Sequence, residues 1–306
     1  MSGKSTTYAP ILLIVIFVLI AAVEFLPEGM IGIDENPYLA VVMLQLLTYA
    51  VPALFYSRIR GRDLTPHLRI RLFRPSQILY IIYSTVFMLS GVLLVSMMMY
   101  TMIPDSFAAA SVSSSAAFAM NERFFDTAYL VLAFAILPAV CEEFLFRGIM
   151  IGEYESGGAS IAIAVSSVMF AMSHFSIARF PVYLFSGIVL GCVLYATRSV
   201  LSTIIIHTVN NTVILLCEDY VLHIVDKQNV SLVLIVIILG AVAVVSGMLM
   251  CYEAQSIYRG YAENNVESEY ASAVKRSIFG RISEAFFTPA FLCAVIIFIV
   301  MSIRDI

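Results

Sequence analysis

Three charged residues interrupt an apolar run in the middle of the chain. Glu142, Glu143 and Arg147 lie within residues 129–151, which are otherwise almost wholly apolar. A charge at the centre of a membrane-spanning helix costs roughly 2.5 to 3.5 kcal/mol, so such a cluster predicts a function. Glu143 and Arg147 stand four positions apart, on one helical face where they can pair. Glu142 is rotated from Glu143 by about 100°, which leaves its carboxylate available for chemistry.

Two histidines and an asparagine occupy later apolar segments at the same four-residue spacing. Phe170 stands four positions before His174, and His207 stands four positions before Asn211. Each pair is therefore expected to share one face of its helix. Taken singly, an intramembrane His or Asn is often a hydrogen-bonding group between helices. Their concentration together with the acidic cluster, in three neighbouring spans, favours a catalytic site.

The depths of these groups in the membrane agree when they are counted from the turns. Glu142 and His174 each lie 16 residues from Gly158, since 158 − 142 = 16 and 174 − 158 = 16. Equal distance from the turn of an antiparallel hairpin means about equal depth. The next turn on that side of the membrane brings His207 and Asn211 inward by two to three helical turns. All four groups are therefore predicted to meet in one cavity.

These residue types suit the hydrolysis of an amide by an activated water molecule. A carboxylate in an apolar pocket is a stronger base than one in water, and a neighbouring imidazole can share the proton. Glu142 and His174 are predicted to form that pair. His207 and Asn211 are predicted to stabilise the developing oxyanion. Asn210, three positions after His207, is the second choice for that role.

Other readings of the same residues remain open. Glu142, His174 and His207 would also make suitable zinc ligands, but the chain lacks the His-Glu-x-x-His signature of common zinc proteases. The sequence therefore leaves open whether a divalent metal such as zinc is a cofactor. A purely structural pair is the alternative interpretation of Glu143 and Arg147. A proton-coupled transporter is disfavoured because no internally repeated halves with broken helices are visible.

The composition is that of a membrane protein. The chain is 61% hydrophobic and 12% charged, and its mean hydropathy is +0.96. Such values predict an all-α, polytopic transmembrane bundle in contact with membrane lipid. The net charge of −4 provides no basic face, so nucleic acid is not an expected partner. The five cysteines show no paired metal-ligand spacing and are interpreted as small apolar residues.

Nine apolar stretches are long enough to cross a bilayer, and they predict eight or nine spans. They lie near residues 9–26, 37–56, 77–103, 125–152, 160–177, 181–197, 200–217, 230–252 and 286–303. The Arg-rich loop at 58–74 is expected in the cytoplasm by the positive-inside rule. The loop at 104–124 is then expected outside, and the polar segment 253–285 inside, on the membrane surface.

The positions of the polar groups divide the chain into three parts. Residues 1–124 are predicted to be N-terminal transmembrane helices, beginning with a retained first span. Residues 125–217 form the predicted catalytic core. Residues 218–306 are predicted to be C-terminal transmembrane helices, interrupted by the cytoplasmic polar segment.

The three motifs resemble those of a known family, the CAAX prenyl protease and bacteriocin-processing family of intramembrane proteases (CPBP, also called Abi). The family patterns Glu-Glu-x-x-x-Arg, Phe-x-x-x-His and His-x-x-x-Asn occur here in order, as Glu142-Glu143…Arg147, Phe170…His174 and His207…Asn211. The flanking Phe146-Arg147-Gly148, Phe185-Ser186-Gly187 and Asn210-Asn211 also agree with the family. The resemblance covers residues 125–217.

The resemblance implies an all-helical bundle with a cavity open towards the cytosol and an endopeptidase activity. In the family, the first Glu acts on water, and the last His and Asn hold the oxyanion. The expected substrate is a peptide or a membrane-associated protein. The resemblance leaves open whether the enzyme is of the metallo or the glutamate type, and whether the substrate is prenylated. A non-catalytic membrane adaptor or a bacteriocin-immunity protein on the same fold is the alternative.

Overall fold

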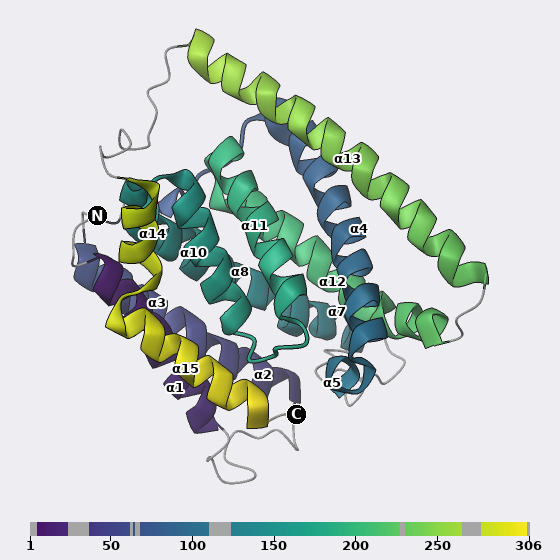
Figure 1. Ribbon diagram of the computed structural model, residues 1–306, viewed down its shortest axis with the longest axis horizontal. Helices are drawn as coiled ribbons and strands as arrows, with labels where there is room; N and C mark the ends of the chain where they lie inside the picture. Colours follow the sequence, from purple (N-terminus) through teal and green to yellow (C-terminus); the bar gives the residue numbers. More distant parts are fainter. Residues whose placement is uncertain are drawn as a thin grey trace.

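The computed structural model describes residues 5–23, 37–61, 64, 68–109, 124–226, 230–264 and 277–304, and these residues contain helices and no strand. The predicted all-α fold is therefore confirmed over the described part of the chain (Figure 1). The helices are α1 (Ser5–Val23), α2 (Pro37–Gln45), η1 (Leu46–Ala50), α3 (Val51–Arg60), η4 (Pro75–Gln77), α4 (Ile78–Met102), α5 (Pro104–Ala109), α7 (Phe124–Val131), η6 (Leu132–Ile136), α8 (Leu137–Glu143), η7 (Phe144–Met150), α9 (Ile151–Tyr154), η8 (Glu155–Gly157), α10 (Ala159–Met172), α11 (Phe180–Thr197), α12 (Val200–Asp226), α13 (Val230–Glu263), α14 (Ile278–Phe286) and α15 (Pro289–Arg304).

Several of these helices are long and apolar enough to cross a membrane. Six segments of the described chain pass this test: Leu39–Arg60, Pro75–Met102, Thr127–Gly157, Phe180–Thr197, Val200–Cys217 and Leu232–Glu263. The pair α14 and α15, bent by 58° at its break, would make a seventh. By the length and composition of its helices, the protein is an integral membrane protein.

Within the described residues, the number of segments that pass this test is close to the predicted eight or nine spans but somewhat lower. Two of the predicted spans form short apolar helices, Thr7–Val23 and Ala159–Met172. Helix α10 has 14 residues, which at about 1.5 Å per residue reach about 21 Å and fall short of the roughly 30 Å hydrocarbon core. Helix α10 alone is therefore shorter than the hydrocarbon core, and residues 173–179 form an irregular connection to α11. Such backbone is tolerated at membrane depth where it is buried in protein or lines a cavity.

In the described part of the chain, three π-helical segments interrupt the α-helices that surround the centre of the bundle. They are η1 after α2, η6 before α8 and η7 after α8. A π-turn widens the helix and is frequently found at functional sites. Glu142 and Glu143, at the end of α8, lie between two of them.

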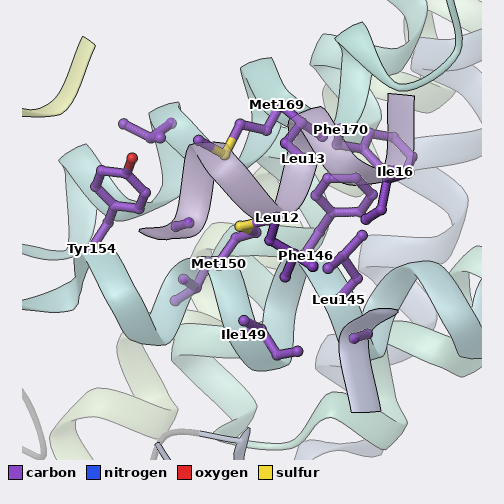
Figure 2. Close-up of a cluster of buried hydrophobic side chains, with 14 of the residues drawn as sticks. Leu12, Leu13, Ile16, Leu145, Phe146, Ile149, Met150, Tyr154, Met169 and Phe170 are labelled. Atoms are coloured by element: carbon purple, nitrogen blue, oxygen red, sulfur yellow. The ribbon is translucent and has the colours of Figure 1, made fainter. Parts of the chain in front are cut away.

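The largest apolar core lies beside α8 and η7, and Figure 2 shows part of it. Leu12, Leu13 and Ile16 of α1 face Phe146 of η7 and Phe170 of α10 (Figure 2). Most of these side chains are fully buried. This packing fixes η7 and α10 against each other. The two helices carry Arg147 and Phe170, so the core determines where these site residues lie.

Arginines gather at one end of the bundle, here termed the Arg-rich end: Arg60, Arg69, Arg71, Arg198 and Arg281. Arg60 Nε lies 2.6 Å from Glu153 Oε1, and Arg69 forms an ion pair with Glu155. Arg71 Nε donates to Arg198 O at 2.6 Å, and Arg281 Nη1 donates to Gly157 O at 2.8 Å. These bonds join α3, α9, η8, α11 and α14 at one level.

The predicted polar segment 253–285 is partly helical. Its first residues continue α13 to Glu263, and its last ones begin α14 at Ile278. Tyr261 in the continued helix is buried and donates from its hydroxyl to Ala196 O at 2.9 Å. Residues 265–276 lie outside the described residues. Helix α13 runs along the outside of the bundle next to α4 (Figure 1).

Candidate active site

A buried charge network is formed by the acidic cluster. Arg147 Nη1 lies 2.8 Å from Glu143 Oε1, and both side chains are almost fully buried. This confirms the ion pair predicted from the four-residue spacing. The guanidinium lies over the Phe170 ring, 4.6 Å from its centroid, and its Nη2 donates to Gly187 O at 3.3 Å.

The same carboxylate orients one of the histidines. His207 Nδ1 lies 2.8 Å from Glu143 Oε1. Because an ionised carboxylate only accepts hydrogen bonds, Nδ1 carries the proton in this contact. The other ring nitrogen, Nε2, then faces Glu142, with 3.8 Å between it and Glu142 Oε2. Glu143 thus connects the first and third motifs, a link that spacing along the chain did not predict.

His174 is held by a different set of contacts. It does not lie on α10 as predicted, since the helix ends at Met172 and His174 follows in the irregular connection. Its Nδ1 lies 2.8 Å from Phe170 O, so this backbone carbonyl accepts the Nδ1 proton. The ring stacks on Tyr183, with 3.6 Å between centroids. Phe170 and His174 are therefore linked by a hydrogen bond between the His174 ring and the Phe170 backbone carbonyl, and not by a shared helical face.

Glu142 lies opposite both histidines. Its Oε2 is 4.0 Å from His174 Nε2 and 3.8 Å from His207 Nε2. That oxygen is buried and has no hydrogen-bond partner among the described residues. Both separations are too long for direct hydrogen bonds, but a water molecule about 2.8 Å from each atom would bridge either gap.

These groups line one cavity of about 260 Å³. Its polar lining consists of Gln45, Ser96, Glu142, His174, Arg179, Tyr183, Ser186, His207, Asn210 and Asn211. The rest of the lining is apolar and comes from α2, α4, η6, α8, α10, α11 and α12. The structure thus brings together Glu142, His174, His207 and Asn211, as the depth comparison predicted.

The cavity lies away from the Arg-rich end. Gln45 belongs to the early part of the helix that ends at Arg60, and Ser96 lies near the far end of the helix that starts at Pro75. Arg179 comes from the connection between α10 and α11, which is also remote from that end. If the Arg-rich end faces the cytoplasm, the cavity extends from the middle of the membrane towards the other side. The cytosolic opening implied by the resemblance therefore stays a prediction.

Some contributors to the site were missed by the sequence reasoning. Gln45 and Tyr49 precede the matched motifs by about 100 residues, and the spacing of a single chain gives no signal for them. Tyr49 donates from its hydroxyl to Ser173 O at 3.3 Å, next to His174. Gly187 had a signal, as part of Phe185-Ser186-Gly187. A Cβ on Gly187 would lie 2.8 Å from Ser167 Cβ, so only glycine allows this approach of α10 and α11.

Glu142 is spaced more widely from His174 and His207, the other predicted zinc ligands, than the ligands of a tetrahedral zinc ion are from one another. No group of three such side chains within the described ranges is placed to hold a metal ion. Two ligands of a tetrahedral zinc lie about 3.4 Å apart, less than the 4.0 and 3.8 Å that separate Glu142 from the two histidines. In this arrangement Glu142 lies farther from each histidine than two ligands of a tetrahedral zinc would lie from each other.

Fold and site together define a class: a polytopic, all-helical membrane protein with a buried glutamate and histidine centre. Residues 124–213 match the family model described as Rce1-like: Type II CAAX prenyl endopeptidase Rce1-like. The match covers 90 of the 306 residues, and over these residues the chain is similar to that family of endopeptidases. No curated protein and no solved structure matches the chain.

Proposed function

We propose that this protein is an endopeptidase of the cell membrane that hydrolyses a peptide bond of a membrane-associated protein or peptide, using a water molecule activated by Glu142 and His174. The observation that carries the proposal is the arrangement at Glu142 Oε2, a buried oxygen without a hydrogen-bond partner. The Nε2 atoms of two histidines face it at 4.0 and 3.8 Å. Both histidines use Nδ1 elsewhere, so their Nε2 atoms are left to act in the cavity.

In the proposed first step, the water lies between Glu142 Oε2 and His174 Nε2. The oxygen of the water attacks the carbonyl carbon of the scissile peptide bond, and Glu142 takes one proton from the water at the same time. The carbon–oxygen bond forms, and the carbonyl oxygen becomes an oxyanion. Glu142 then returns the proton to the leaving nitrogen as the carbon–nitrogen bond breaks. His174 keeps the water in place and shares its proton.

His207 and Asn211 are proposed to stabilise the oxyanion. The Asn211 amide donates directly. His207 donates from Nε2 when the ring is an imidazolium, a form that the carboxylate of Glu143 stabilises at Nδ1, much as the Asp of a catalytic triad does. With Arg147 and His207 positive and both glutamates negative, the four buried groups are neutral in sum. A neutral cluster makes the charged imidazolium acceptable in an apolar surrounding.

The test is cleavage by the purified protein in lipid vesicles. The probe is a peptide ending in Cys-aliphatic-aliphatic-X, used both farnesylated and unmodified, with mass spectrometry of the products. Glu142→Gln and His174→Ala are each expected to abolish cleavage while peptide binding stays measurable. Met43→Leu, on the exposed side of α2, is the matched control. Cleavage by Glu142→Gln at the wild-type rate would refute the mechanism and favour a non-catalytic adaptor or immunity protein.

The same assay tests metal dependence. Because the two histidines and Glu142 are spaced too widely for one zinc ion, we expect turnover to persist in the presence of a strong chelator. Loss of turnover on chelation, with recovery on adding zinc and no other divalent ion, would instead support the metallo type.

A further inference from the structure

A glutamine outside the three motifs faces the same cavity. Gln45 is the last residue of α2 and lies directly before the π-helical segment η1. Its side chain lines the cavity together with Val41, one turn earlier. Residues 37–50 precede the region that matches the family model, residues 124–213, so the match assigns no role to this glutamine.

The amide of Gln45 has an unused acceptor. Its Oε1 is buried and has no hydrogen-bond partner among the described residues. Thr48 of the following segment η1 behaves differently, because its Oγ1 donates to Leu44 O at 2.7 Å. Buried polar atoms in folded proteins nearly always have a partner. A polar side chain in an otherwise apolar membrane helix is also costly and by default functional. We therefore infer that the hydrogen-bond partner of Gln45 Oε1 is a group of a ligand in the cavity.

The wall formed by α12 offers a comparable group. Asn210 is 7% exposed, and its Oδ1 is likewise buried without a partner. Helix α2 packs against α8 and η6, and α12 packs against the same two segments. The carboxamides of Gln45 and Asn210 thus enter one cavity from different helices, with Glu142 of α8 also in its lining.

A carboxamide matches a peptide backbone chemically. It carries one acceptor oxygen and an NH₂ donor, which complement the N–H and C=O of an extended chain. This complementarity is the same whichever way the amide is turned. A prenyl group or an aliphatic side chain has no such donor, so the apolar lining would receive those parts of the substrate and the carboxamide would receive its backbone.

We propose that Gln45 is a substrate-positioning residue that hydrogen-bonds a backbone amide of the peptide next to the scissile bond. The inference rests on the proposed peptidase function. Gln45 does not touch the reacting atoms, and it acts by fixing the register of the peptide in the cavity. The π-turn that follows Gln45 carries Tyr49, whose hydroxyl binds Ser173 O beside His174. One segment of the chain would then hold both the substrate and the connection that bears His174.

The test couples a protein variant to a change in the peptide. Gln45→Met keeps the length of the side chain and removes the amide, and Met43→Leu, at an exposed position of the same helix, serves as control. In the peptide, each backbone N–H near the scissile bond is replaced in turn by N-methyl. For the wild type and the control, one N-methyl peptide is expected to raise KM about fivefold to tenfold, the loss of one hydrogen bond. Gln45→Met should raise KM for the parent peptide by a similar factor, with kcat nearly unchanged.

The decisive result is the combination. If Gln45 binds that N–H, methylating it should add no further loss in Gln45→Met. Equal losses on methylation in wild type and Gln45→Met, or an unchanged KM for the parent peptide, would overturn the role of Gln45 and leave the proposed function standing. Failure of the wild type to cleave or bind any peptide would overturn the proposed function, and this inference with it.

Discussion

Removing Arg147 should destabilise the protein strongly. The side chain is fully buried, pairs with Glu143 at 2.8 Å and also donates to Gly187 O. Arg147→Met removes the arginine partner of the buried Glu143 carboxylate, which then keeps its contacts with His207 and Thr203. Breaking a buried pair in this way costs about 3 to 5 kcal/mol, a large part of the 5 to 15 kcal/mol that typically stabilises a folded protein.

Two comparisons isolate the charge from the loss of packing. Arg60→Met removes an arginine that is 20% exposed, although it also pairs with a buried glutamate. Partial solvation should keep its cost well below that of Arg147→Met. The double variant Glu143→Gln/Arg147→Met removes the carboxylate that Arg147→Met leaves unpaired, while Glu142 and His207 keep opposite charges, so most of the lost stability should return. Its turnover should stay low, because a neutral amide stabilises the His207 imidazolium less well.

Thermal unfolding in detergent, followed by far-ultraviolet circular dichroism because the chain has no tryptophan, measures these differences. The yield of monodisperse protein provides a second readout. The reasoning is refuted if Arg147→Met unfolds at the wild-type temperature. It is equally refuted if the double variant is no more stable than Arg147→Met, since the cost would then not come from an unpaired charge.

Three further predictions concern turnover, packing and orientation. Asn211→Ala should lower kcat by about a hundredfold to a thousandfold, the usual effect of removing an oxyanion donor. Asn210→Ala should act mainly on KM. The reverse pattern in the cleavage assay would exchange the roles of the two asparagines. Gly187→Leu should lower the unfolding temperature in detergent, because α10 and α11 could not approach as closely, and an unchanged temperature would show that the two helices yield without cost. If the Arg-rich end is cytoplasmic, a reporter cysteine at Asp105 in a cysteine-free background should react with an impermeant thiol reagent added outside the cell, and one at Ser76 should not. The opposite labelling would place the cavity on the cytoplasmic side of the membrane. Ser113 in the predicted outer loop is a second reporter position, although it lies outside the described residues.

The sequence by itself determined the class of fold and singled out the candidate site residues. Hydropathy identified the apolar helices, since burying apolar side chains in lipid needs no partner from elsewhere in the chain. The i, i+4 relation of Glu143 and Arg147 follows from helix geometry alone, and the structure contains that pair. The depth comparison also succeeded for Glu142 and His174, because both are measured along the chain from one turn.

Length alone could not decide which apolar stretches cross the membrane. Membrane spans and buried helices have the same apolar composition, so hydropathy could not predict that α10 ends at Met172. The irregular connection that follows carries His174, and its position depends on contacts with Tyr49 and Tyr183.

Only the tertiary structure decided which distant side chains complete the site. Glu143 reaches His207, 64 positions further along the chain, and no periodicity within one helix encodes a contact between two helices. Gln45 enters the cavity from a helix that carries no motif. Local patterns are governed by the backbone geometry of each segment, whereas the cavity arises from the packing of many segments, and that packing depends on all of their side chains together.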